Sequence, residues 1–168
     1  MDDFKKKYKS QGIYFTVEDE NALASKFREN LELYFDSIVR GAQLKHDKKN
    51  LEILWVDDRP ENNVYERKAL EKYGISFHIA LSTEQALRIM ETNDFSLIIS
   101  DMGRKEGKDE GYVLLDKVRK TNKSIPFLIY AGSRKEEHIK ETIRRGGQGC
   151  TNDPTELVNL VISNMLKT

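Results

Sequence analysis

The chain has little cysteine and proline and contains no long apolar run. A single cysteine, Cys150, among 168 residues excludes an internal disulfide, and no cysteine or histidine lies near it at a zinc-binding spacing. We expect Cys150 to pack as a small apolar residue. No stretch approaches the roughly 20 apolar residues that a membrane-spanning helix needs. We therefore expect a cytoplasmic protein without a membrane partner.

The chain also lacks an excess of charge of either sign. Its 28 basic and 28 acidic residues give a formal net charge of zero. A neutral protein has no global field that would attract nucleic acid or an anionic membrane surface, so we expect neither as a partner. The lysines near the start, Lys5, Lys6, Lys7 and Lys9, are typical of a solvated tail.

From residue 51 onward, apolar runs of strand length alternate with segments of helical period. The runs are 51–56, 75–81, 96–100, 126–131 and 149–152. This alternation predicts an α/β domain with a parallel sheet over residues 51–168. Helix start signals follow the strands, namely Pro60, Ser82 with Gln85, Ser133 with Glu136, and Asp153 with Pro154 and Glu156.

The first fifty residues have a different organisation. Helical periodicity predicts one helix over residues 16–43, followed by a polar linker, so we place the domain boundary near residue 50. The predicted helix carries an apolar stripe that includes Leu23, Phe27 and Leu31. Its own domain, a partner helix and a second copy of the chain are all open as the surface that covers this stripe.

Three aspartates follow two of the most apolar runs. Asp57 and Asp58 end the first run, and Asp101 ends the third. The carboxyl ends of neighbouring parallel strands meet at one sheet edge, where doubly wound folds bind ligands. Crowded carboxylates raise one another's pKa values unless they share a proton or bind a cation. We favour a divalent cation, Mg²⁺, because it prefers oxygen ligands.

Residues 51–168 resemble the receiver domain of two-component response regulators. The resemblance rests on residues 53–58 (ILWVDD), 97–101 (LIISD) and 111–119 (GYVLLDKVR), and on Ala131 after the fourth run, all in receiver order. It implies a flavodoxin-like, doubly wound five-stranded parallel sheet in the order 2-1-3-4-5, with the N-terminal helix as an addition.

The resemblance also implies a site. Asp101 matches the aspartate that accepts a phosphoryl group, and Asp57 and Asp58 match the acids that hold Mg²⁺. The backbone carbonyl of Gly103, two residues past the phosphoacceptor, matches a further metal ligand. A histidine kinase or a phosphotransfer protein is the partner that the resemblance implies upstream.

Two positions depart from the receiver pattern. Receivers carry a threonine or serine where this chain has Tyr130, and a lysine where it has Asp153. An aspartate at the lysine position repels a phosphoryl group, and we interpret Asp153 instead as a helix cap. We consider Arg104 as a replacement for the missing cation, and Ser133 or Thr151 as a replacement for the missing hydroxyl.

The segment between the third run and the next predicted helix, residues 102–110, also departs from receivers. It is rich in charge, contains glycine and is about two residues longer than in receivers. We expect a mobile, solvated loop.

Three hypotheses for function follow. In the first, the chain is a Mg²⁺-dependent phosphoacceptor that signals through a protein effector or through self-association of its N-terminal helix. In the second, it is a pseudo-receiver that binds partners without phosphorylation. In the third, it is a Mg²⁺-dependent phosphohydrolase, which the adjacent positions of Asp57 and Asp58 disfavour because a general acid is expected two residues after the nucleophile. We therefore expect no enzymatic turnover.

Overall fold

The computed structural model describes residues 51–132 and 135–165. These residues form a five-stranded sheet in the order β2-β1-β3-β4-β5, with every neighbouring pair parallel. The predicted fold is therefore confirmed for this part of the chain. The predicted helix over 16–43 and the boundary near residue 50 lie outside the described residues and stay predictions.

The strands agree with the apolar runs to within one residue at each end. Their bounds are β1 (Leu51–Val56), β2 (Ile75–Ala80), β3 (Leu97–Ser100), β4 (Phe127–Tyr130) and β5 (Gly149–Thr151). The short strands β3 and β4 are buried along nearly their whole length. Strands covered on both faces are expected to be continuous in apolar residues, and this is the composition that predicted them.

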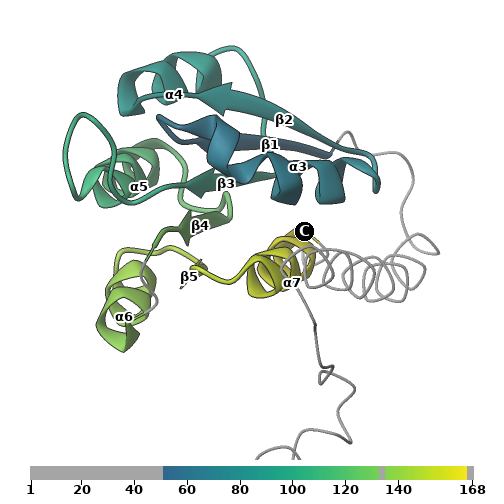
Figure 1. Ribbon diagram of the computed structural model, residues 1–168. Coiled ribbons are helices and arrows are strands. Elements are labelled where there is room, and N and C mark those ends of the chain that lie inside the picture. The colour runs from purple at the N-terminus through teal and green to yellow at the C-terminus, as the bar shows by residue number, and fades with distance from the viewer. Residues whose placement is uncertain (1–50, 133–134, 166–168) are drawn as a thin grey trace, which may run out of the picture. The chain divides into compact units, whose positions relative to one another are not determined.

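Helices connect the strands and cover both faces of the sheet. They are the 3-10 turn η2 (Pro60–Asn63), α3 (Val64–Glu71), α4 (Thr83–Met90), α5 (Glu110–Thr121), α6 (Glu136–Arg144) and α7 (Pro154–Met165). Figure 1 shows α3 and α7 on one side of the sheet and α4, α5 and α6 on the other. This is the layer arrangement of a doubly wound fold.

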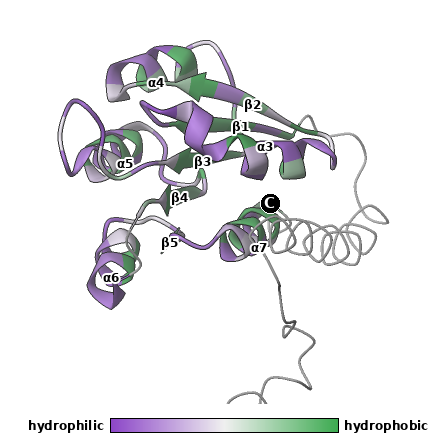
Figure 2. Ribbon diagram, in the orientation of Figure 1, coloured by the Kyte–Doolittle hydropathy of each residue, from purple (hydrophilic) through white to green (hydrophobic). Residues whose placement is uncertain are grey.

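Successive side chains of each strand point to opposite faces of the sheet. Leu54 and Val56 of β1 face one core cluster, together with residues of α4 and α5 such as Ala86 and Leu114. The intervening Trp55 is equally buried and lies on the opposite face. Figure 2 shows the strands as the most apolar part of the domain, with polar residues along the helices.

Two of the predicted helix starts are capped by side chains. The Ser82 hydroxyl accepts a hydrogen bond from the Gln85 N–H at 3.1 Å, and Asp153 Oδ1 accepts one from the Glu156 N–H at 2.9 Å, so both predicted caps are confirmed. Pro60 begins η2 as expected. Helix α6 begins after Lys135, which makes no side-chain cap bond, and Ser133 lies outside the described residues.

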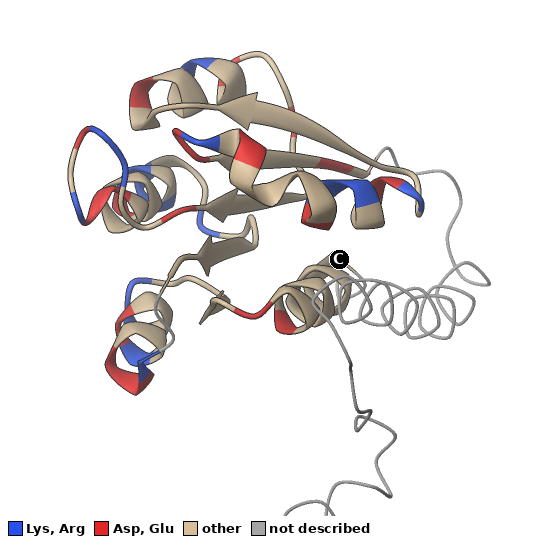
Figure 3. Ribbon diagram, viewed as in Figure 1, with Lys and Arg blue, Asp and Glu red and all other residues tan. Residues whose placement is uncertain are grey.

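Charged residues of the described chain lie mainly on helices and loops, as Figure 3 shows. Cys150 is buried, as predicted. His78 lies within 3.4 Å of Glu52 at the amino end of the sheet, away from the acid-bearing edge. None of the helices in residues 51–132 and 135–165 is long and apolar enough to cross a membrane.

Gly111 lets helix α5 approach the end of β3 closely. Its N–H donates to the Met102 carbonyl at 2.9 Å. A Cβ atom at this position would lie 2.9 Å from the Asp101 carbonyl oxygen and 3.0 Å from Met102 Cα. These are backbone atoms, so the clash cannot be relieved by rotating a side chain. The absence of a side chain here fixes how α5 packs beside Asp101.

We predict that Gly111→Ala lowers the free energy of unfolding by about 1 to 3 kcal/mol through overpacking. Gly132→Ala is the matched control, because a Cβ atom at Gly132 has no neighbour within 4 Å. Urea unfolding followed by circular dichroism measures both variants. Equal stability of the two would contradict the close packing described for Gly111.

Candidate functional site

The register between β1 and β3 brings the three predicted acids together. Val56 pairs with Ser100, and the Asp101 N–H donates to the Val56 carbonyl at 2.9 Å. Asp57 follows Val56 and Asp101 follows Ser100, so the backbones of the two aspartates lie side by side. One carboxylate oxygen from each of Asp57, Asp58 and Asp101 lies within 4.8 Å of the other two.

Backbone and amide donors orient Asp57, the most buried acid of the three, which is 6% exposed. Its Oδ1 accepts from the Arg59 N–H at 2.7 Å, and its Oδ2 accepts from Asn63 Nδ2 at 2.5 Å. A carboxylate oxygen has two lone pairs, so each oxygen retains one for a further ligand. The Asp57 carboxylate is thus oriented by two hydrogen bonds and can still bind a cation.

Asp58 and Asp101 each receive one backbone donor. Asp58 Oδ2 accepts from the Lys105 N–H at 3.1 Å, and Asp101 Oδ1 accepts from the Met102 N–H at 2.8 Å. The loop after β3 therefore contacts the acid at the end of β1. Burial, and after it the charge of Asp57, raise the pKa of Asp101 above its usual range. The cluster consequently favours a bound cation.

The donor set fits Mg²⁺. Three carboxylates within 4.8 Å supply hard oxygen ligands, and Gly103, whose carbonyl the resemblance implies as a ligand, lines the same cavity. No histidine or cysteine takes part in the cluster, which disfavours zinc. Bound there, Mg²⁺ would offset the charge of the carboxylates and of a phosphoryl group.

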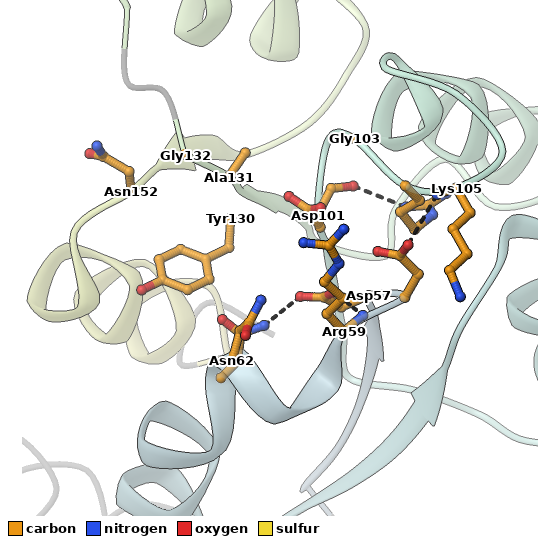
Figure 4. Close-up of a pocket in the computed structure, with 13 residues that line it drawn as sticks. Asp57, Arg59, Asn62, Asp101, Gly103, Lys105, Tyr130, Ala131, Gly132 and Asn152 are labelled. Atoms are coloured by element: carbon orange, nitrogen blue, oxygen red, sulfur yellow. Dashed lines mark hydrogen bonds between the residues drawn. The ribbon is translucent and has the colours of Figure 1, made fainter.

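The acids open onto a cavity of about 580 Å³ at the carboxyl edge of the sheet. Figure 4 shows the cavity between the acidic cluster and Tyr130. Its remaining lining is polar or small and consists of Arg59, Asn62, Asn63, Gly103, Arg104, Lys105, Ala131, Gly132 and Asn152. The cavity is therefore an open, hydrophilic site.

Tyr130 lines the cavity but directs its hydroxyl elsewhere. The hydroxyl donates to Glu66 Oε1 of α3 at 3.0 Å, and Figure 4 shows it pointing away from Asp101. The ring packs edge-on against Trp55, with centroids 6.0 Å apart. Burial and then the charge of Glu66 raise the pKa of Tyr130 well above its ordinary value. A neutral, tethered phenol thus occupies the position of the receiver hydroxyl.

Asp153 and Thr151 are both engaged at the start of α7. Asp153 caps the helix, and the Thr151 hydroxyl donates to Glu156 Oε2 at 2.5 Å while accepting from the Asp153 N–H at 3.0 Å. Neither residue is among those that line the cavity, whereas Asn152 is. A contact between Thr151 and a phosphoryl group stays a prediction, as does one from Ser133, which lies outside the described residues.

Arg104 is held in a polar network that links three elements. Its Nη1 donates to Ser100 Oγ at 2.7 Å and to the Asp101 carbonyl at 2.9 Å. Its Nη2 donates to Thr83 Oγ1 at 2.6 Å and to the Glu110 carbonyl at 3.1 Å. The side chain has 0% exposure. The guanidinium thus stabilises the packing of α4 and α5 beside β3, and its predicted contact with a phosphoryl group stays untested.

The prediction of a solvated loop over residues 102–110 is wrong at Arg104, because this residue is only 6% exposed. Arg104 and Gly107 exchange backbone hydrogen bonds of 2.9 and 3.0 Å, which close a tight turn. Glu106 then accepts from Arg104 Nε at 3.3 Å and from the Thr83 N–H at the start of α4 at 3.0 Å. Opposite charges inside the segment therefore fold it onto the domain.

Arg59, Asn62 and Asn63 line the cavity although they were not among the site residues predicted from the sequence. All three lie between β1 and α3, directly after the acid pair. The topology contained the signal, because the loop that follows a strand of a parallel sheet lies at the same edge as the strand's last residue. Asn63 is the most informative of them, since its amide holds Asp57.

The geometry defines a doubly wound α/β domain with an acidic pocket at the carboxyl edge of its sheet. The response regulator receiver domain family matches residues 53–162. The chain belongs to this family, which confirms the resemblance seen in the sequence.

Individual relatives are distant. An uncharacterised 14.6 kDa protein of Leptolyngbya boryana is 29% identical over 116 residues, covering 66% of this chain and 87% of that protein. A two-component response regulator from Clostridium difficile is 23% identical with a TM-score of 0.61, covering 70% of this chain and 96% of that chain. A receiver domain protein from Methanospirillum hungatei is 21% identical with a TM-score of 0.62, covering 71% and 96%. The two solved structures support the fold alone.

We predict that Arg104→Ala lowers the free energy of unfolding by about 3 kcal/mol, because it leaves the buried Ser100 and Thr83 hydroxyls without their donor and the Glu110 carboxylate, 16% exposed, without its cation. Arg88→Ala, which removes an exposed guanidinium from α4, is the matched control and should change stability by less than about 0.5 kcal/mol. Urea denaturation measures both. A loss for Arg104→Ala no larger than the control would contradict the network.

Without a cation, Asp101→Asn should stabilise the protein at neutral pH by less than about 1 kcal/mol, since solvent screens a half-buried charge. The raised pKa of Asp101 means that the protonated form favours folding, and this contribution disappears as pH rises through the folded-state pKa. The difference should shrink as pH falls toward the usual aspartate range.

Thermal unfolding in EDTA and in Mg²⁺ measures this effect. Mg²⁺ should reverse the order of stability, because the native protein retains three carboxylates. Asp94→Asn, at an exposed position before β3, should show neither change. The repulsion is refuted if the native protein in EDTA is more stable than Asp101→Asn.

Proposed function

We propose that this receiver domain accepts a phosphoryl group on Asp101 in a Mg²⁺-dependent reaction and signals through protein contacts. The observation that carries this proposal is the convergence of Asp57, Asp58 and Asp101 within 4.8 Å at the cavity. Three acids at one edge of the sheet, of which Asp57 is buried and Asp58 and Asp101 are partly buried, supply both a cation site and a nucleophile. A structural role for the acids does not require this crowding.

The chain's own residues prepare Asp101 for attack. The Met102 N–H holds Oδ1 at 2.8 Å, so we assign Oδ2 as the attacking oxygen. A bond forms between Oδ2 and phosphorus while the bond from phosphorus to the donor atom breaks, and the donor leaves with that electron pair. Mg²⁺, held by Asp57, Asp58, Asp101 and the Gly103 carbonyl, would supply charge neutralisation.

The upstream partner consistent with this chemistry is a histidine kinase or a phosphotransfer protein. The cavity is open to solvent at the sheet edge, which allows a donor side chain on another protein to reach Asp101. We propose that output depends on a protein effector or on self-association through the predicted N-terminal helix. We propose no nucleic-acid or membrane partner and no catalytic turnover, and a cytoplasmic site of action.

Tyr130 and Asp153 favour a second candidate, a pseudo-receiver that binds partners without phosphorylation. The Tyr130 hydroxyl is bound to Glu66, and the Asp153 carboxylate caps α7, so neither group faces the acids. A domain that never holds a phosphoryl group needs neither the hydroxyl nor the lysine that receivers carry at these two positions. The two candidates differ in one measurable property, which is whether Asp101 becomes phosphorylated.

We predict that incubation with Mg²⁺ and acetyl phosphate adds one phosphoryl group to the native protein and none to Asp101→Asn, as measured by intact mass spectrometry. Removal of Mg²⁺ with EDTA should abolish the addition, because the carboxylates then repel the donor. Asp94→Asn is the matched control and should be labelled as the native protein is.

Beryllofluoride binding distinguishes the two candidates further, because beryllofluoride mimics an acyl phosphate without requiring transfer. Failure of the native protein to accept a phosphoryl group and to bind beryllofluoride in Mg²⁺ would refute phosphorylation and support the pseudo-receiver. Release of phosphate in many turnovers from a small phosphate ester would instead support the phosphohydrolase.

A further inference from the structure

The cavity needs a cation that the receiver pattern does not supply here. With a phosphoryl group on Asp101, Asp57 and Asp58 carry up to two negative charges, and the acyl phosphate itself carries about two more. One Mg²⁺ offsets only part of this charge. The receiver position for a lysine is Asp153 in this chain, and its carboxylate caps α7. A phosphoryl group on Asp101 therefore requires a positive charge from another position.

Three basic residues line the cavity, and two of them are poorly placed for this role. The Arg104 guanidinium donates to Ser100, Asp101 and Thr83 and has no exposed surface. Lys105 gives its main-chain N–H to Asp58, and Figure 4 shows its side chain extending away from Asp101. The remaining cation is Arg59.

Arg59 is placed at the cluster by its own backbone. Its N–H donates to Asp57 Oδ1 at 2.7 Å, and the Pro60 ring restricts its backbone conformation. Figure 4 shows the guanidinium directed back towards Asp101. The residue is exposed, and no carboxylate in residues 51–132 and 135–165 forms a salt bridge with it. An anchored backbone thus carries an uncommitted guanidinium.

We propose that Arg59 is the residue that contacts the oxygens of the phosphoryl group on Asp101, in place of the absent lysine. This inference rests on the proposed phosphorylation of Asp101. A guanidinium is suited to the role because its planar fork binds two phosphoryl oxygens at once. Arg59 reaches the group from the β1 side of the cavity, whereas Asp153 lies after β5.

The proposal predicts opposite effects on two ligands. Removing the Arg59 charge removes an attraction for the phosphoryl group and also removes a repulsion on Mg²⁺ at the neighbouring acids. Arg59→Ala should therefore bind Mg²⁺ as tightly as the native protein or more tightly. The same variant should bind beryllofluoride in saturating Mg²⁺ at least about tenfold more weakly, because tenfold is the size expected for a single charge-assisted hydrogen bond and the fork makes two. A purely structural role would weaken both ligands together.

The experiment is isothermal titration calorimetry of Mg²⁺, and then of beryllofluoride in Mg²⁺, on four proteins. These are the native chain, Arg59→Ala, Arg59→Lys and Arg88→Ala. Arg59→Lys should regain part of the beryllofluoride affinity, because it restores the charge without the fork. Arg88→Ala removes an exposed arginine from α4 and should match the native protein. Labelling rates with acetyl phosphate should follow the beryllofluoride affinities.

Two results would overturn the assignment of Arg59 while leaving phosphorylation intact. In the first, Arg59→Ala binds beryllofluoride as the native protein does, and Lys105→Ala carries the loss instead. In the second, Arg59→Ala loses affinity for Mg²⁺ and beryllofluoride to the same extent. A native protein that binds no beryllofluoride and accepts no phosphoryl group refutes the proposed function, and the role of Arg59 with it.

Discussion

The hydrogen bonds between β1 and β3 are the constraint on which the site depends. The Asp101 N–H donates to the Val56 carbonyl, and the Asp57 N–H donates to Ala80 at the end of β2. Three strands therefore end level at one edge, and the acids that follow β1 and β3 have no freedom to separate. A slip of one residue between β1 and β3 would turn the acids of the slipped strand to the other face of the sheet, away from those of its partner. The crowding of negative charge is a result of the register rather than of local sequence alone.

The three crowded acids lie beside a buried cation, Arg104, which forms ion pairs with Glu106 and Glu110. The Arg104 guanidinium lies behind Asp101, bonded to its carbonyl and to Ser100, and it joins β3 to α4 and α5. The loop that carries Arg104 also gives a backbone N–H to Asp58. The same segment therefore ties the acids to the first turn of α4. A ligand that moves Asp58 or Asp101 therefore changes the hydrogen bonds that these residues make with Lys105 and Arg104.

The strands and the acids could be predicted from the sequence because their signals are local. An apolar run that ends in aspartate is complete within eight residues, as in 51–58 and 97–101. The partners of Arg104 and Tyr130 could not be predicted in this way. Arg104 bonds to Thr83, 21 residues earlier, and Tyr130 bonds to Glu66, 64 residues earlier. Because these partners lie far away in the sequence, the direction of each side chain is fixed only when the helices pack on the sheet. Asp153 was predictable because its cap is formed with Glu156, three residues away.

The packing of Tyr130 has an optical consequence. The chain contains one tryptophan, Trp55, which is fully buried in β1. Its ring meets the Tyr130 ring edge-on, with an angle of 89° between the ring planes, and the Arg67 guanidinium lies 5.8 Å from its centroid. All tryptophan fluorescence of the protein therefore originates beside Tyr130, which stands where receivers carry a threonine or serine. A change in that emission reports the state of the Tyr130 side of the cavity, and it requires no label.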